Sequence, residues 1–171
     1  GSAGSAGSAD EFIFDRFKNR RIVGTIANVL CDYLQIDKND LKAKFHNVEH
    51  HRAHMASAFF VSPYEEASIL SIDGMGDFTS TMWGKGKDNK IIVDDAIHFP
   101  HSLGILYTAV SQWLGFDQYG DEGKVMGLAP YGSPKYVDQF TKILQIQSDN
   151  TFEIDQSYLS YRAEGGTMTW S

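Results

Sequence analysis

The spacing of hydrophobic residues predicts two amphipathic helices, and a further helix is predicted between them. Between residues 19 and 34 hydrophobic residues recur every three or four positions, the period of an α-helix with one buried face. Residues 49–61 predict a helix that ends before Pro63, and residues 102–116 predict a helix capped by Ser102. We expect the first and third helices each to bury one hydrophobic stripe. These stripes are Ile22, Val23, Ile26, Val29, Leu30, Tyr33 and Leu34, and Leu103, Leu106, Tyr107, Val110, Trp113 and Leu114.

Short, largely apolar segments between the helices predict β-strands. Residues 67–74, 78–86 and 90–99 follow one another, with glycine, aspartate and asparagine at the breaks. Three successive strands joined by tight turns form an antiparallel meander. Residues 44–48 predict a further short strand directly before the second helix.

The last part of the chain predicts a loop and one more helix. Glycines and charged residues are dense over residues 118–132, which favours a loop. The final helix is predicted over residues 133–144, with Ser133 as its N-cap and Pro134 at its first position.

Composition and charge narrow the class of protein. The 171 residues are 42% hydrophobic, enough for one folded domain. Fifteen basic against 22 acidic residues give a net charge of -7, which argues against a nucleic-acid-binding surface. No segment approaches the roughly 20 apolar residues of a membrane span, and the chain shows no secretion signal. Cys31 is the one cysteine, so we expect a buried thiol and a cytoplasmic protein.

The nine N-terminal residues differ from the rest of the chain. They repeat the triplet Gly-Ser-Ala three times, which is typical of an engineered flexible linker. We therefore expect residues 10–171 to carry the natural fold, as a fragment of a longer protein.

Three histidines lie within five positions of the second predicted helix. Helical side chains four positions apart share one face, about 5–6 Å apart, so His50 and His54 can reach one ion while His51 points away. The positive end of the helix dipole favours neutral imidazoles, the form that binds metal. Alternatively, the histidines form only the polar edge of an ordinary helix, since an HxxxH pair needs further ligands to make a site.

Asp73 supplies a possible third ligand. It ends the first strand of the meander and is followed by Gly74 and Gly76. Acidic residues at such positions bind cations or lie where backbone N–H groups approach phosphate. Two imidazoles and one carboxylate form an open coordination shell for Fe(II), Mn(II) or Zn(II). Alternatively, Asp73 only helps to form a hairpin turn, because Asp-Gly is a strong hairpin signal.

A second polar segment favours nucleotide binding. Asp121 and Glu122 can accept hydrogen bonds from ribose hydroxyls, and Lys124 can bind a phosphate group. The segment matches no GxxxxGK[ST] phosphate loop, and a solvated helix-capping loop would have the same composition. We expect nucleotide or substrate contacts from two places in the chain, namely Gly74, Gly76 and Asp77, and Asp121, Glu122 and Lys124.

Four blocks of sequence together resemble one enzyme family. In order, within residues 48–132, they read VEHHRAHMASAFF, SILSIDGMGD, FPHSLGILYTAVSQWLGF and DEGKVMGLAPYG. The set resembles the O-carbamoyltransferase family that includes NodU and TobZ. This resemblance implies a partial α/β domain of the actin-like, RNase H type (ASKHA), with a mixed sheet that contains the antiparallel meander and is flanked by helices.

The same resemblance implies a metal site and a reaction. In the family, the two histidines of HxxxH and the aspartate ending the next strand bind an iron-type metal; these correspond to His50, His54 and Asp73. A separate YrdC-like domain makes carbamoyl-adenylate from carbamoyl phosphate and ATP. The actin-like domain then transfers the carbamoyl group to a hydroxyl of a small molecule. We expect part of such an ATP-dependent transferase with Fe(II) as cofactor, and assign no catalytic residue.

Two family features are not found in these residues. No HDAS-like motif precedes His50, and a further metal-binding aspartate and the YrdC-like domain are expected beyond residue 171. The alternative function is a catalytically inert fragment or scaffold module without a working metal site. Sugar-kinase and chaperone-type ATPases share the actin-like ancestry, but they bind magnesium through carboxylates and water and need no HxxxH pair.

Overall fold

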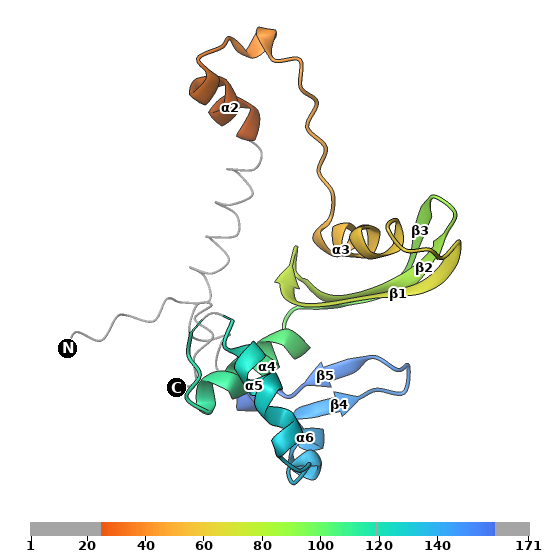
Figure 1. Cartoon of the computed structure of the whole chain (residues 1–171), viewed down its shortest axis with the longest axis vertical. Coiled ribbons are helices and arrows are strands. Elements are labelled where there is room, and N and C mark those ends of the chain that lie inside the picture. The colour runs from red at the N-terminus through yellow and green to blue at the C-terminus, as the bar shows by residue number, and fades with distance from the viewer. Residues whose placement is uncertain (1–24, 119, 160–171) are drawn as a thin grey trace, which may run out of the picture. The chain divides into compact units, whose positions relative to one another are not determined.

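The computed structural model describes residues 25–118 and 120–159 (Figure 1). The described residues belong to two units, one that ends at Asn47 and one that begins at Val48. The predicted linker and the first part of the predicted N-terminal helix, including Ile22 and Val23, lie outside the described residues.

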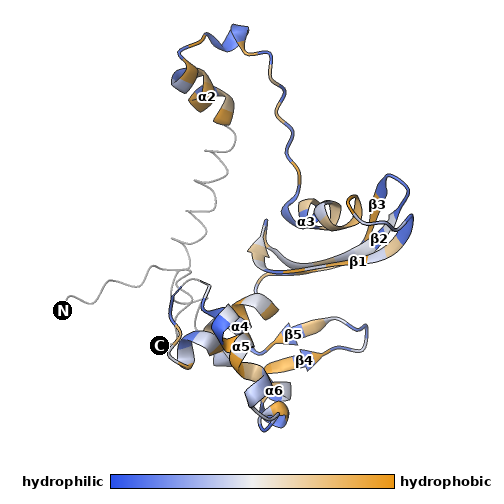
Figure 2. Cartoon of the chain, in the orientation of Figure 1, coloured by the Kyte–Doolittle hydropathy of each residue, from blue (hydrophilic) through white to orange (hydrophobic). Residues whose placement is uncertain are grey.

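The first unit contains α2 (Ile26–Leu34) and the 3₁₀ helix η1 (Lys38–Asp40). α2 confirms a helix in this region and carries mostly hydrophobic residues (Figure 2), and Cys31 is buried as expected. The expectation of a buried stripe is wrong for the described part of this unit, because η1 is too short to cover a helix face. The exposed stripe residues are Ile26, Val29, Tyr33 and Leu34.

The second unit is built around an antiparallel sheet with the strand order β1-β2-β3. β1 (Glu66–Gly76), β2 (Thr79–Lys87) and β3 (Lys90–His98) follow one another through two short turns. Buried and exposed positions alternate along β1, so that Ile69 and Ser71 lie on the buried face and Leu70 and Ile72 on the exposed one. The predicted meander is confirmed.

The predicted strand over residues 44–48 is wrong. These residues form neither helix nor strand, and Phe45 and Val48 are exposed. A strand is stabilised by hydrogen bonds to a neighbour, and none of the described strands pairs with this segment.

α3 (His50–Phe59) confirms the predicted second helix and packs on one face of the sheet (Figure 1). Met55 and Phe59 extend from the helix to Ile69 of β1 and Met82 of β2, and all four side chains are buried. This hydrophobic cluster holds α3 on the face formed by β1 and β2.

α4 (Leu103–Trp113) confirms the predicted third helix, with Ser102 as its side-chain cap. The predicted stripe is only partly right. Leu106 is buried, but Trp113 and Leu114 are 71% and 50% exposed, because the N-terminal turn of α4 lies against β1 and its other end does not. The buried residues of α4 are Ile105, Leu106, Ala109 and Ser111.

The predicted loop over residues 118–132 is wrong in part, since it contains α5 (Glu122–Leu128) and η2 (Ala129–Tyr131). The hydroxyl of Thr108 on α4 donates a hydrogen bond to Glu122 in the first turn of α5. This contact with α4 stabilises α5, and such tertiary contacts outweigh the low helix propensity of the glycines.

α6 (Val137–Ile143) begins later than predicted. Ser133 is not its cap, because the backbone N–H of Lys135 donates to the carbonyl of Ser133 and keeps this segment in a turn. An unpredicted antiparallel hairpin of β4 (Leu144–Ile146) and β5 (Phe152–Ile154) follows, then η3 (Gln156–Tyr158).

The described elements thus form mixed α/β structure with a three-stranded antiparallel sheet flanked by helices. Among the described residues, no helix combines the length and the hydropathy that a membrane span requires.

Candidate metal centre

The first turns of α3 present His50 and His54 on one face. Glu49 begins the helix, and its carboxylate accepts hydrogen bonds from the backbone N–H groups of His51 and Arg52 at 3.0 and 2.7 Å. An acid at this position satisfies free N–H groups and matches the positive end of the helix dipole. The four-residue spacing then places the His50 and His54 rings next to each other, with centroids 4.5 Å apart.

A β-bulge in β1 orients Asp73. Regular pairing with β2 stops after Ile72 and resumes at Gly76, so residues 73–75 leave the ladder. Bulges redirect side chains and are common beside functional sites. The backbone N–H of Gly74 donates to Asp73 Oδ1 at 2.6 Å, and Oδ2 is directed to α3.

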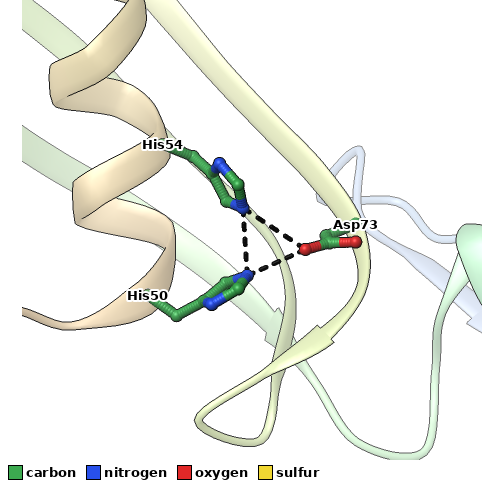
Figure 3. Close-up of side chains that lie close together, drawn as sticks. All are labelled: His50, His54 and Asp73. Carbon is green, nitrogen blue, oxygen red and sulfur yellow. Dashed lines mark hydrogen bonds and ion pairs between the residues drawn. The ribbon is translucent and has the colours of Figure 1, made fainter.

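Figure 3 shows three donor atoms from α3 and β1 that meet at one point. His50 Nε2 lies 2.8 Å from Asp73 Oδ2, His54 Nε2 lies 3.3 Å from the same oxygen, and the two Nε2 atoms are 3.0 Å apart. The side chains of His50, His54 and Asp73 are 38%, 52% and 41% exposed. The structure therefore brings the three predicted residues together at a place that solvent can reach.

The spacing of these atoms can accommodate a metal ion, and the three contacts cannot all be hydrogen bonds at once. A carboxylate oxygen only accepts, so both Nε2 atoms would need a proton to donate to Asp73, and two N–H groups would then face each other at 3.0 Å. A cation between the three atoms satisfies all of them. Donors bound to one ion at about 2.0–2.2 Å lie roughly 3–3.5 Å apart, close to the distances observed.

Asp73 is held in its charged form. The hydrogen bond from His50 is the main cause that lowers the pKa of Asp73 below its usual value; Gly74 N–H and His54 act in the same direction, and partial burial opposes them. Because the pKa is lowered, the carboxylate stabilises the fold above the usual aspartate pKa of about 3.9, and this contribution is lost as the pH falls through the folded-state pKa. The deprotonated form is also the form that binds metal.

His51 faces away from the cluster, as predicted. Its ring is fully buried, its Nε2–H donates to the carbonyl of Thr79 at 2.8 Å, and its Nδ1 lies 2.8 Å from the hydroxyl of Ser71. Both ring nitrogens therefore have partners in the sheet. His51 fastens α3 to β1 and β2 and has no nitrogen left for a metal ion.

The N-terminus of α4 supports the Asp73 bulge, and this contact was not predicted. Ser102 is fully buried, and its hydroxyl donates to the carbonyl of Gly74 at 2.5 Å. A Cβ at Gly104 would lie 2.7 Å from the Gly74 nitrogen and 2.8 Å from the Asp73 carbonyl oxygen. Ser102 is recognisable as a helix cap from its sequence, but nothing nearby in the sequence identifies the strand that Gly104 approaches.

Replacing Gly104 with alanine is expected to lower both the free energy of unfolding and metal affinity. The new methyl group would meet backbone atoms of Gly74 and Asp73, and overpacking of this kind costs about 1–3 kcal/mol. Gly127→Ala in α5 is the control, because a Cβ there has nothing within 4 Å and alanine favours a helix. Urea unfolding measures both variants, and equal stability of Gly104→Ala and Gly127→Ala would contradict the close contact.

Three of the predicted nucleotide contacts adjoin the cluster. Gly74 donates its N–H to Asp73, and a Cβ at Gly76 would overlap the His50 ring. Asp77 Oδ2 accepts a hydrogen bond from the backbone N–H of His50 at 3.0 Å. Each of the three residues contacts a candidate metal ligand.

The other three predicted contacts lie at the start of α5. Lys124 Nζ is 2.6 Å from Asp121 Oδ1, and the hydroxyl of Thr108 donates to Glu122 Oε1 at 2.6 Å. These hydrogen bonds lower the pKa of Asp121 and of Glu122 respectively. An ammonium group has three donors, so Lys124 can bind a phosphate in addition to Asp121. The two carboxylates also stabilise α5 and its contact with α4.

Comparison with known proteins identifies the family. The family model described as the carbamoyltransferase N-terminus matches residues 9–169, and the chain belongs to this family. The uncharacterized protein sll1178 of Synechocystis sp. is 48% identical over 122 residues, covering 71% of this chain and 20% of the relative.

Two nodulation proteins are also similar to this chain. NolNO of Sinorhizobium fredii is 40% identical over 110 residues, which cover 63% of this chain and 16% of NolNO. NolO of Bradyrhizobium diazoefficiens is 34% identical over 110 residues, which cover 63% of this chain and 20% of NolO. The predicted resemblance is confirmed, and the chain spans about a fifth of the length of these relatives.

Proposed function

We propose that this chain is part of an ATP-dependent O-carbamoyltransferase in which His50, His54 and Asp73 bind one divalent transition-metal ion. The observation that carries the proposal is the approach of both Nε2 atoms to Asp73 Oδ2 within 3.3 Å, in a member of the carbamoyltransferase N-terminus family. Two imidazoles and one carboxylate with open positions are the donor set of non-haem Fe(II) sites, so Fe(II) is the proposed ion.

The proposed reaction moves a carbamoyl group from carbamoyl-adenylate to a hydroxyl of a small molecule. When bound, the metal would act as a Lewis acid that polarises the carbamoyl-adenylate. The three side chains would hold the ion from the side of α3 and β1, and their exposed side would be left for the substrate. Formation of the adenylate from carbamoyl phosphate and ATP is assigned to a YrdC-like domain of the full-length protein.

The nucleotide part of the adenylate is proposed to contact both polar segments. Gly74 and Gly76 have no side chain and let a phosphate approach the backbone at the end of β1, and Lys124, 64% exposed, can bind it as a cation. Asp121 and Glu122 can accept hydrogen bonds from ribose hydroxyls, and Asp77 directly follows Gly76 at the end of β1.

We further propose an actin-like fold for the complete domain and a cytoplasmic location. The fold proposal is supported by the three-stranded antiparallel meander with a helix directly after β3. The location proposal is supported by the single, buried cysteine.

In the full-length protein, His54→Ala is expected to abolish carbamoyl transfer while adenylate formation continues. The reason is that His54 belongs to the proposed transfer site, whereas adenylate formation is assigned to another domain. Mass spectrometry of the acceptor measures the first step, and release of pyrophosphate from ATP measures the second. Loss of both steps, or of neither, would contradict the proposed division.

A further inference from the structure

The geometry points to Asp77 as a positioning residue that holds His50 in the orientation the metal centre needs. This inference rests on the proposed metal site. Asp77 lies in the turn between β1 and β2, and its Oδ2 accepts a hydrogen bond at 3.0 Å from the backbone N–H of His50, 27 positions away in the sequence. The contact fixes the backbone from which the His50 ring extends.

Asp77 completes the cap of α3. The first N–H groups of a helix have no partner within the helix. Glu49 satisfies those of His51 and Arg52, and Asp77 satisfies that of His50. The start of α3 is therefore capped by two residues. Glu49 directly precedes the helix, and Asp77 lies in a turn of the same sheet to which Asp73 belongs.

The turn that carries Asp77 is held in a strained conformation. Gly76 pairs with Thr79, so Asp77 and Phe78 form a two-residue loop, with φ angles of 51° and 66°. Left-handed conformations are costly for residues other than glycine and persist where the surroundings hold them. The carbonyl of Phe78 accepts a hydrogen bond from the N–H of Phe99 at 2.8 Å, and Asp77 is held by His50.

The same turn also contacts the imidazole ring. A Cβ at Gly76 would overlap ring atoms of His50, so the ring lies directly against the backbone of Gly76. The turn thus contacts His50 at its N–H and at its ring, and His50 Nε2 lies 2.8 Å from Asp73 Oδ2. Asp77 is not itself in the cluster, which among the described residues consists of His50, His54 and Asp73.

Two substitutions separate a positioning role from a charge role. Asp77→Ala removes the acceptor for the His50 N–H, whereas Asp77→Asn keeps an oxygen acceptor, tolerates the left-handed conformation and loses the negative charge. In a Co²⁺ titration of the 171-residue chain followed by absorbance, Asp77→Ala is expected to weaken affinity about 10–100-fold. Asp77→Asn is expected to bind Co²⁺ like the unsubstituted chain.

Asp149→Ala provides the matched control. Asp149 lies in the turn between β4 and β5 and accepts a hydrogen bond from the backbone N–H of Thr151 at 2.9 Å. It is therefore also an aspartate that caps a turn, and its removal is expected to leave Co²⁺ affinity unchanged. Thermal unfolding of each variant tests whether the fold is retained.

The possible outcomes distinguish a failure of the positioning role of Asp77 from a failure of the proposed metal site. Equal losses of affinity in Asp77→Ala and Asp77→Asn, or no loss in Asp77→Ala, would overturn the positioning role. If the unsubstituted chain binds no Co²⁺, the proposed function fails, and NMR contacts between the His50 and His54 rings decide the positioning role. Loss of those contacts in Asp77→Ala and their retention in Asp77→Asn would support it, and their retention in both would overturn it.

Discussion

Replacing His54 with alanine is expected to abolish binding of Co²⁺, a probe for Fe(II), by the 171-residue chain. His54 Nε2 lies 3.0 Å from His50 Nε2 and 3.3 Å from Asp73 Oδ2, so its removal leaves a single imidazole beside the carboxylate. Loss of an outer hydrogen-bond partner of a metal ligand costs about 10–100-fold in affinity, and loss of the ligand itself should cost more. Absorbance titration and the metal content of the dialysed protein measure the effect.

His46→Ala is the control for this experiment. His46 is an exposed histidine in the other unit of the chain, so its removal tests for nonspecific binding of Co²⁺ by surface imidazoles. The side chain of His54 is 52% exposed, and its loss should therefore leave the thermal midpoint nearly unchanged. If both variants bind Co²⁺ as tightly as the unsubstituted chain, the three side chains form a hydrogen-bonded cluster and not a metal site.

The identity of the cluster could be predicted because its residues follow local rules. The four-residue spacing of His50 and His54 selects one helix face and excludes His51, which is buried against Ser71 and Thr79. Asp73 lies at the end of a short, largely apolar segment and is followed by glycine, a pattern that is typical of a strand end. Their approach required α3 to pack beside the end of β1. This packing was a condition of the predicted site, and the sequence pattern of the two elements does not establish it.

The contacts that position the three side chains of the cluster could not be predicted, because they join backbone segments that are distant in the sequence. The bulge at residues 73–75, the cap of His50 by Asp77 and the close approach of Gly104 leave no local signal. A glycine in the sequence permits another segment of backbone to approach closely, but the sequence does not identify that segment. Asp77 was predicted to contact a nucleotide, and its contact with His50 adds a role that sequence reasoning missed.

The errors in the predicted fold have a similar cause. Residues 44–48 have the composition of a strand, but no described strand pairs with them. The segment that begins at Asp121 has the composition of a loop, but its contact with Thr108 on α4 helps to keep α5 helical. In both cases the presence or absence of a tertiary partner outweighed local propensity.

Leu106→Ala is expected to lower the free energy of unfolding by about 2–5 kcal/mol, the usual cost of removing a buried leucine side chain. Leu106 is 6% exposed on the face of α4 that packs against the rest of its unit, so alanine leaves a cavity. Urea unfolding of the 171-residue chain, with the m-value compared to that of the unsubstituted protein, measures the change.

Leu114→Ala makes the same leucine-to-alanine substitution at the C-terminal end of α4. Leu114 belongs to the same predicted hydrophobic stripe but is 50% exposed, so its replacement should change stability by no more than about 0.5 kcal/mol. The difference between the two variants therefore measures where the packed part of α4 ends. Equal losses would show that the whole predicted stripe is buried in solution, and a larger loss for Leu114→Ala would show that α4 packs through its C-terminal end. Because Ser102 and Gly104 join the start of α4 to Asp73, packing at Leu106 also helps to hold the candidate metal centre together.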